Sequence, residues 1–228
     1  MEGIQFSQDG HIYTRNNEEY ASVSRTISKF KPLFPRNHIA KAIAKRDGVG
    51  PELVLAQWQQ KAAESCKRGN AIHKMLEDYE KEGIIPEDNL YYAEILRNFA
   101  NWKSTKKGKS TPEEIIYSDT YKVAGTVDLP MKQGKHIDIW DYKTNKELTN
   151  ENKYNKFYRN GLEYIGDTKY QGYALQLSVY ALLFQEQGLR PRHLGILWID
   201  DEGRLHEIPV PFMRQEALHI LKTHGSYN

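Results

Sequence analysis

The pattern of hydrophobic and polar positions divides the chain into a helical first half and a strand-rich second half. Alternating residues around the turn-like Gln8-Asp9-Gly10 and Asn16-Asn17 predict a short N-terminal hairpin. Apolar residues at helical spacing then predict four helices, interrupted by prolines and glycines. They cover residues 24–30, 37–46, a long stretch from Pro51 to a stop at Gly83, and 90–102. A basic loop, residues 103–109, ends this half.

The second half begins with three predicted antiparallel strands, residues 114–118, 121–129 and 136–144. A strongly apolar helix, residues 169–187, then leads to strands 194–199 and 205–210 and to a terminal helix after Pro211. A helix between strands suits a crossover connection, so we expect an α/β fold with a mixed sheet covered by helices. We expect one domain, in which residues 1–110 form the hairpin and helical part and residues 111–228 the sheet, crossover helix and closing strands.

The amino-acid composition indicates the class of protein to which this domain belongs and the metal ligands that it can offer. With 39% hydrophobic and 27% charged residues, and without a long apolar run or a signal-peptide pattern, we expect a soluble cytoplasmic protein. The 32 basic and 30 acidic residues nearly cancel, so net charge alone does not indicate nucleic acid. Cys66 is the only cysteine, which excludes an internal disulfide, a zinc knuckle and a cysteine-bound iron–sulfur cluster. Any metal must therefore be held by oxygen and imidazole ligands.

The segment HIDIWDYKT carries the first chemical signal. A strand places Ile137, Ile139, Asp141 and Lys143 on one face, with Asp138, Trp140 and Tyr142 on the other. A core-facing register that ends in two charges is costly unless the charges are paired or bind a metal. For an isolated D-x-K sequence, a structural ion pair at a strand end is the better explanation, because short motifs often match by accident.

A second carboxylate makes the metal interpretation more specific. Asp128 ends the neighbouring strand VAGTVD, and a hairpin would bring it beside Asp141. Two such carboxylates repel each other unless a cation lies between them, and oxygen ligands with room for water favour Mg²⁺ or Mn²⁺. Lys143 would stabilise the phosphate oxyanion or orient the water. The pattern predicts phosphodiester hydrolysis.

Four ordered motifs strengthen this interpretation: RGNAIHKMLEDY at 68–79, GTVD at 125–128, DYK at 141–143 and QLSVY at 176–180. Together they resemble the PD-(D/E)xK nuclease superfamily, with the best match to its RecB-like exonuclease branch. The resemblance covers about half of the chain, and Val127 replaces the proline of the superfamily's name. Relatives that carry an iron–sulfur cluster use four cysteines, and this chain has one, so it is similar instead to the phage-type and mitochondrial genome maintenance exonucleases that carry no cluster.

The resemblance implies a restriction-endonuclease-like fold and a set of site residues. It makes His73, Asp128, Asp141 and the Tyr142 backbone carbonyl ligands of Mg²⁺ or Mn²⁺, Lys143 the catalytic lysine, and Gln176 and Tyr180 supporting members of the catalytic set. From the residues alone, His73 could also be a packed residue at a helix boundary, and Gln176 with Tyr180 an ordinary helix edge. Glu77 either holds the imidazole or a metal-bound water, or belongs to a solvated acidic face.

Residues 145–169 interleave cations with aromatic rings directly after the predicted catalytic strand. Cations follow phosphates and rings stack on unpaired bases, so we expect this stretch, the guiding segment, to direct a single strand to the metal. A merely solvated charged loop is the alternative. The residues that we expect to contact nucleic acid are Lys146, Lys153, Tyr154, Lys156, Phe157, Tyr158 and Arg159.

These expectations combine into one function. We expect a metal-dependent DNA exonuclease of bacterial or phage type that hydrolyses strands from DNA ends during recombination, repair or replication, with a protein of those pathways as a further partner and no membrane partner. Two alternatives remain: a structure-specific flap endonuclease with the same metal site, and a catalytically inactive nucleic-acid-binding module. RNA is a further substrate to test.

Overall fold

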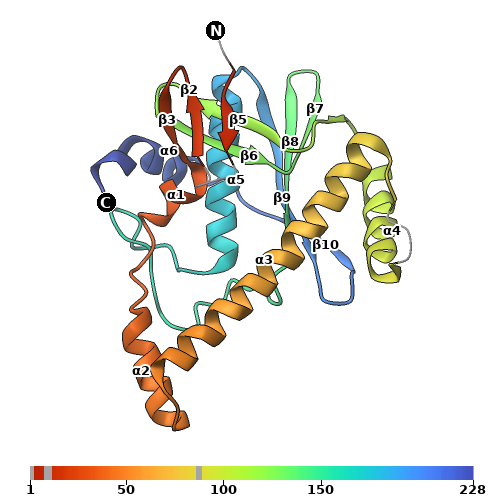
Figure 1. Ribbon diagram of the computed structural model, residues 1–228. Helices are drawn as coiled ribbons and strands as arrows, with labels where there is room; N and C mark the ends of the chain where they lie inside the picture. Colours follow the sequence, from red (N-terminus) through yellow and green to blue (C-terminus); the bar gives the residue numbers. More distant parts are fainter. Residues whose placement is uncertain (1–2, 8–11, 86–88, 228) are drawn as a thin grey trace.

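The computed structural model describes residues 3–7, 12–85 and 89–227. Within these residues the chain forms two five-stranded mixed sheets with helices on both sides (Figure 1). The first sheet has the order β1 (Gln5–Ser7), β2 (Ile12–Arg15), β3 (Glu18–Ser22), β6 (Val123–Val127), β5 (Glu114–Ser118). The second has the order β10 (Leu205–Pro209), β9 (Arg190–Ile199), β8 (His136–Lys143), β7 (Leu129–Gln133), β4 (Lys109–Ser110). The predicted α/β class is confirmed.

The two sheets meet at Asp128. The sequence predicts one continuous strand over 121–129, but the chain leaves the first sheet after β6 and enters the second with β7. The reason is local: the amide of Tyr142 donates to the Asp128 carboxylate at 2.7 Å. Leu129 lies opposite Trp140 in the β7–β8 pair, so the predicted placement of Asp128 beside Asp141 is confirmed.

One side of the sheets is covered by α1 (Val23–Ser28), α5 (Lys169–Glu186) and α6 (Arg214–Thr223). Helix α5 joins β8 to the parallel strand β9, which confirms the predicted crossover. Nearly every residue of α5 from Ala174 to Phe184 is buried, so the helix packs on all sides, as its uniformly apolar sequence requires. It forms the centre of the larger hydrophobic core.

The other side of the second sheet is covered by α4 (Leu90–Ser104) and by the C-terminal part of α3 (Pro51–Glu82). Ile72 and Leu76 pack there with Phe99, Trp140 and Tyr142. Strand β8 is therefore buried on both faces, as the sequence predicts, and any side chain that it contributes to a site is held firmly.

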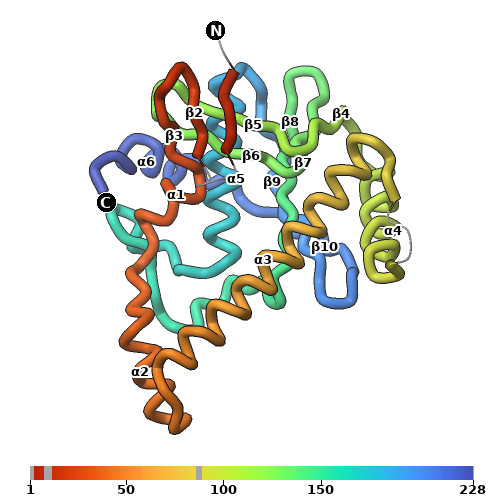
Figure 2. Tube along the Cα trace, viewed as in Figure 1, coloured from red at the N-terminus to blue at the C-terminus, as the bar shows by residue number. Residues whose placement is uncertain are grey.

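Helix α2 (Arg36–Asp47) and the first half of α3 form a helical hairpin that projects from the body of the molecule (Figures 1 and 2). We call α2 together with residues 51–67 of α3 the arm. A small apolar contact of Ala40, Ala44 and Val54 holds its two helices together. Residues 59–67 of α3 are exposed on every face, which is typical of a helix that bridges two parts of a molecule.

Several predicted turns and ends agree with the structure. Asn16 and Asn17 form the β2–β3 turn with φ of 51° and 62°, and α3 ends at Gly83 with φ of 70°. The turn predicted at Gln8-Asp9-Gly10 lies outside the described residues. A short 3₁₀ helix (His224–Ser226) follows α6. Over the described ranges, no helix combines the length and hydrophobicity needed to cross a membrane.

Candidate active site

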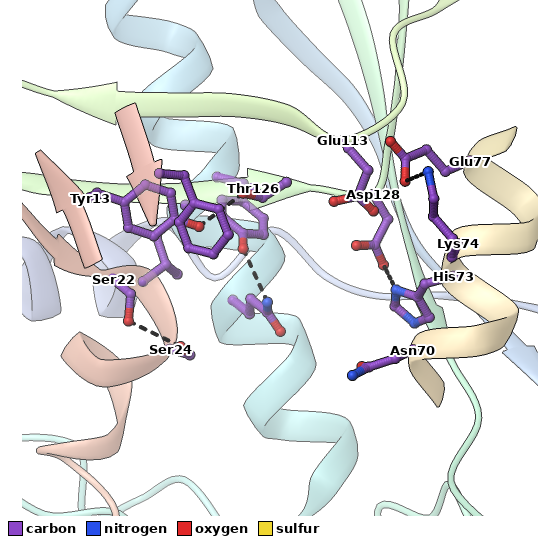
Figure 3. Close-up of a pocket in the computed structure, with 15 residues that line it drawn as sticks. Tyr13, Ser22, Ser24, Asn70, His73, Lys74, Glu77, Glu113, Thr126 and Asp128 are labelled. Carbon is purple, nitrogen blue, oxygen red and sulfur yellow. Dashed lines mark hydrogen bonds and ion pairs between the residues drawn. The ribbon is translucent and has the colours of Figure 1, made fainter. Parts of the chain in front are cut away.

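Three side chains from separate elements converge at the joint between the sheets. His73 comes from α3, Asp128 from the β6–β7 junction and Glu113 from the residue before β5 (Figure 3). Each offers one ligand atom, and these atoms lie within 4.8 Å of one another. His73 Nδ1 lies 3.6 Å from Asp128 Oδ2. The predicted pair of His73 and Asp128 is thus brought together with a second carboxylate, Glu113, that the sequence patterns did not predict.

Glu113 is held in place by the backbone. Its amide donates to the Asp128 carbonyl at 3.0 Å, and its φ of 56° lies in the left-handed region, which non-glycine residues seldom adopt. Glu114 pairs with Val127 in the β5–β6 ladder, so the residue before Glu114 must lie opposite Asp128. Extending the predicted strand pairing by one residue would have found Glu113.

Asp141 and Lys143 lie together on β8 beside this cluster. Asp141 is 2% exposed, and its Oδ2 forms an ion pair with the Lys143 ammonium. That oxygen accepts no hydrogen bond of good geometry. The ammonium also lies 4.7 Å from the centre of the Tyr173 ring. The D-x-K sequence therefore does form an ion pair, but one placed next to Asp128 and His73.

Electrostatic coupling shows how crowded the negative charges are. Burial and then the charge of Asp128 raise the pKa of Glu113 to about 7. Burial raises the pKa of Asp141 to about 6 against the attraction of Lys143, with Asp128 adding to the rise. For Asp128 burial acts in the same sense, but His73 and Lys143 outweigh it and lower its pKa. The pKa of Lys143 is raised because Asp141 and Asp128 outweigh its burial.

This donor set fits a divalent cation. Carboxylate oxygens and one imidazole nitrogen are suitable ligands for Mg²⁺ or Mn²⁺, and a cation would relieve the repulsion that raises the carboxyl pKa values. The buried Asp141 carboxylate, which pairs with the Lys143 ammonium, offers further oxygens that a cation could use.

Gln176 and Tyr180 lie on the α5 face that approaches Asp128, and they contact each other rather than Lys143. The Gln176 amide donates to the Tyr180 hydroxyl at 3.2 Å. A Cβ added at Gly125 would lie 2.7 Å from the Tyr180 ring, so this glycine of GTVD lets α5 approach β6. Burial, and then the charge of Asp141, raises the pKa of Tyr180, which keeps the phenol protonated as a donor.

Two cavities meet at His73. One, of about 740 Å³, runs along Asp128, Gln176 and Tyr180. The other, of about 900 Å³, extends past Lys143 and Lys146. Because His73 lines both cavities, there is room for a nucleic-acid strand to lie across the site between α3 and the sheets.

Glu77 also lines the first cavity, but its carboxylate pairs with Lys81 at 2.5 Å and with Lys74 at 3.5 Å. These lysines lie on the same helix, three and four residues away. The acidic-face interpretation therefore describes Glu77 better than a role in holding the imidazole.

The guiding segment divides into exposed and anchored residues. Tyr154 is 82% exposed and Phe157 41% exposed, as expected for rings that contact bases. Tyr158 is buried in the main core, so it is not available for stacking. The Arg159 guanidinium donates to the Lys31 carbonyl at 2.8 Å, which ties the segment to the chain before α2.

The cations of the segment have different surroundings. Lys146 lines the second cavity beside Lys143. Lys153 pairs with Glu147 at 3.4 Å, and the Lys156 ammonium lies 5.4 Å from the centre of the Phe34 ring. We call the group of His73, Glu113 and Asp128 the metal cluster, as the candidate site of a metal ion. The guiding segment thus reaches from this group to the base of the arm.

A family model described as the PD-(D/E)XK nuclease superfamily matches residues 87–216, more than half of the chain. The chain belongs to this superfamily. The match includes Asp128, the D-x-K pair and the Gln176–Tyr180 pair, whereas His73 lies before it. Membership makes the protein a hydrolytic nuclease, whose substrate is a nucleic acid and whose family uses divalent metals.

Two solved structures show a weaker similarity to the chain. The protein SSO0001 is 17% identical, with a TM-score of 0.43, over 93% of this chain and 79% of the other. A protein from Eubacterium rectale, described as a presumed exonuclease, is 16% identical with a TM-score of 0.46, over 98% and 85% of the two chains. Likeness at this level bears on neither substrate nor activity. No curated protein matches the chain significantly.

Proposed function

We propose that the protein is a Mg²⁺- or Mn²⁺-dependent DNA exonuclease of the RecB-like branch, which hydrolyses a single strand from DNA ends in recombination, repair or replication. The observation that carries the proposal is the convergence of His73, Glu113 and Asp128 beside the Asp141–Lys143 pair. In this proposal residues 1–228 act as one nuclease domain, because the first half supplies His73 and the second half the other residues.

The cation would be held by His73, Asp128 and Asp141, by the Tyr142 carbonyl as the resemblance implies, and by Glu113. When bound, the cation activates water and neutralises charge on the scissile phosphate. Lys143 stays protonated because its pKa is raised, so it presents a fixed positive charge to a phosphate oxygen. The buried Tyr180 phenol and the Gln176 amide provide donors at the cavity wall.

The geometry supports a single strand as substrate. Two cavities share His73 in their walls, and Lys146 and Lys169 of the guiding segment line the second one. The rings of Tyr154 and Phe157 in the same segment are exposed. Rings that stack on bases require those bases to be unpaired.

The test uses linear single- and double-stranded DNA labelled at the 5′ or 3′ end, circular single-stranded DNA and an RNA oligomer, each with Mg²⁺, Mn²⁺ or chelator. We expect metal-dependent shortening from the ends of linear DNA while circles stay intact. Cleaved circles would favour the flap endonuclease alternative, and cleavage in chelator or no cleavage at all would contradict the proposal.

A matched pair of lysine variants separates catalysis from general charge. We expect Lys143→Ala to lower kcat about 10²- to 10³-fold, the usual effect of removing one oxyanion donor. Lys135→Ala removes the same charge from the exposed turn between β7 and β8 and should leave the rate unchanged. Equal activity of the two variants would contradict the role of Lys143.

A further inference from the structure

The arm carries an unusual concentration of positive charge. The twelve residues of α2 include four cationic side chains and one anionic side chain, a net charge of +3, against +2 for the whole chain. Asp47, the only acid of this helix, pairs with its neighbour Arg46 at 2.6 Å. Lys41 and Lys45 are exposed one turn apart, with His38 one turn before them, so they line one side of the helix.

Aromatic rings lie at the base of the same arm. Phe34, directly before α2, is 59% exposed, and its ring centre lies 6.1 Å from that of Trp58 on α3. The Lys156 ammonium of the guiding segment lies 5.4 Å from the Phe34 ring centre. Leu33 beside Phe34 is 76% exposed. Three separate segments thus build an exposed cluster of aromatic rings with a cation at its edge.

This combination selects one kind of occupant. Cations alone would suit any polyanion, and exposed rings alone would suit many apolar partners. A nucleic acid with unpaired bases satisfies both, because phosphates pair with lysines while bases stack on rings. The single acid of α2 is already paired with Arg46, so the helix offers the charge complementarity that such a strand requires.

We propose that the arm is a second docking site for a single nucleic-acid strand, in which Phe34 and Trp58 stack on bases and Lys41 and Lys45 contact phosphates. The inference rests on the proposed function, since the docked strand is the one whose end reaches the metal cluster. The proposed contact residues are separate from that cluster, because Phe34, Trp58, Lys41 and Lys45 line neither cavity at His73; only the end of the arm nearest His73, from Glu64 to Cys66, lines the second cavity.

The geometry of α3 sets a length threshold. Trp58 and His73 stand on one continuous helix, about 22 Å apart at 1.5 Å per residue. At the 3.4 Å spacing of stacked nucleotides, about six nucleotides bridge that distance. A strand of four nucleotides bound at the metal cluster therefore does not reach the rings of Trp58 and Phe34, whereas one of sixteen nucleotides reaches both the metal cluster and these rings.

The experiment measures the two sites separately on the full-length protein. Affinity for fluorescein-labelled oligothymidylates of four and sixteen nucleotides is measured by anisotropy in chelator, and hydrolysis of the four-nucleotide strand is measured with Mg²⁺. We expect Phe34→Ala to weaken binding of the longer strand roughly 5- to 150-fold, the effect of losing one base stack. Hydrolysis of the shorter strand should be unchanged.

Further variants distinguish stacking and charge from unfolding of the arm. Phe34→Tyr keeps the ring and should restore affinity, whereas Phe34→Leu keeps only an apolar side chain and should not. Lys41→Gln with Lys45→Gln should reduce the slope of log affinity against log salt by about 0.7 for each phosphate that the protein no longer neutralises. The charge-matched pair Lys107→Gln with Lys135→Gln, outside the arm, should keep the full slope.

An unchanged affinity of Phe34→Ala and of the double lysine variant for the sixteen-nucleotide strand would overturn the arm proposal. If the unaltered protein still hydrolyses the short strand, the proposed function stands. Absence of hydrolysis by the unaltered protein, with binding to the long strand still dependent on Phe34, would instead contradict the nuclease proposal and leave the arm as a binding site.

Discussion

Replacing Glu113 with glutamine tests both the metal cluster and the electrostatics of the site. In the folded protein, burial and then the charge of Asp128 raise the Glu113 pKa from 4.5 to about 7. The folded state therefore holds this proton more tightly than the unfolded state. Stability that is present below about pH 4.5 must be lost as pH rises to about 7, because ionisation then favours the unfolded chain.

The magnitude follows from that difference in pKa. Each unit corresponds to about 1.4 kcal/mol, so the largest possible effect is about 3 kcal/mol. The side chain is partly exposed, and solvent screening reduces the expected effect to about 1–2 kcal/mol. In chelator at pH 8, Glu113→Gln should therefore be more stable than the unaltered protein by that amount, and at pH 4.5 the two should be nearly equal.

Urea unfolding at several pH values, with chelator or Mn²⁺, measures how the stability difference between the two proteins depends on pH and on the metal. Mn²⁺ at a hundred times its Kd would stabilise the unaltered protein by about 2.7 kcal/mol, and Glu113→Gln should lose much of that gain. Glu114→Gln is the matched control, because the Glu114 carboxylate pairs with Lys132 at 2.6 Å, away from the cluster. The reasoning would be refuted if Glu113→Gln were less stable than the unaltered protein at pH 8 in chelator, or if Mn²⁺ stabilised both proteins equally.

Two further predictions concern packing and a structural carboxylate. Gly125→Ala should lower the free energy of unfolding, measured with urea, by about 1–3 kcal/mol, because the new methyl group would lie 2.7 Å from the Tyr180 ring. An unchanged urea midpoint would show that α5 can move away. Hydrogen bonds from His206 and Arg204 outweigh the burial of Asp200 and lower its pKa. Above about pH 4, Asp200→Asn should therefore lower the free energy of unfolding by about 1.5–3 kcal/mol. This difference should shrink as the pH falls below that value. A loss of stability that does not depend on pH would contradict this account.

Periodicity was sufficient for most of the fold. The uniformly apolar stretch after Lys169 and the two-sided burial of β8 follow directly from sequence, and the hairpin register brings Asp128 beside Asp141. The β5–β6 and β7–β8 pairs are local hairpins, so residue spacing carries their geometry. The site residues that depend on such pairing were accordingly predictable.

Three features that the sequence analysis missed or misplaced leave no trace in the pattern of hydrophobic and polar residues. Glu113 lies just outside a strand at positive φ, where alternation carries no information. Tyr158 stands among charged residues and yet packs in the main core, because the fold places it against distant apolar residues. The break in the strand at Asp128 arises from its bond to the Tyr142 amide, which no pattern of hydrophobic residues records.

The single long helix α3 has a mechanical consequence. Its C-terminal part is clamped in the core by Ile72 and Leu76, both fully buried, whereas residues 59–67 are open to solvent on every side. The firmly packed end of α3 is therefore the one that carries His73, whereas the other end is held through α2 and through the contacts of Lys31 and Phe34 with the guiding segment. A tilt of about 10° would move Trp58 by roughly 4 Å over the 22 Å between them and displace His73 very little. Such a tilt would let the arm follow a nucleic-acid strand while the imidazole keeps its position.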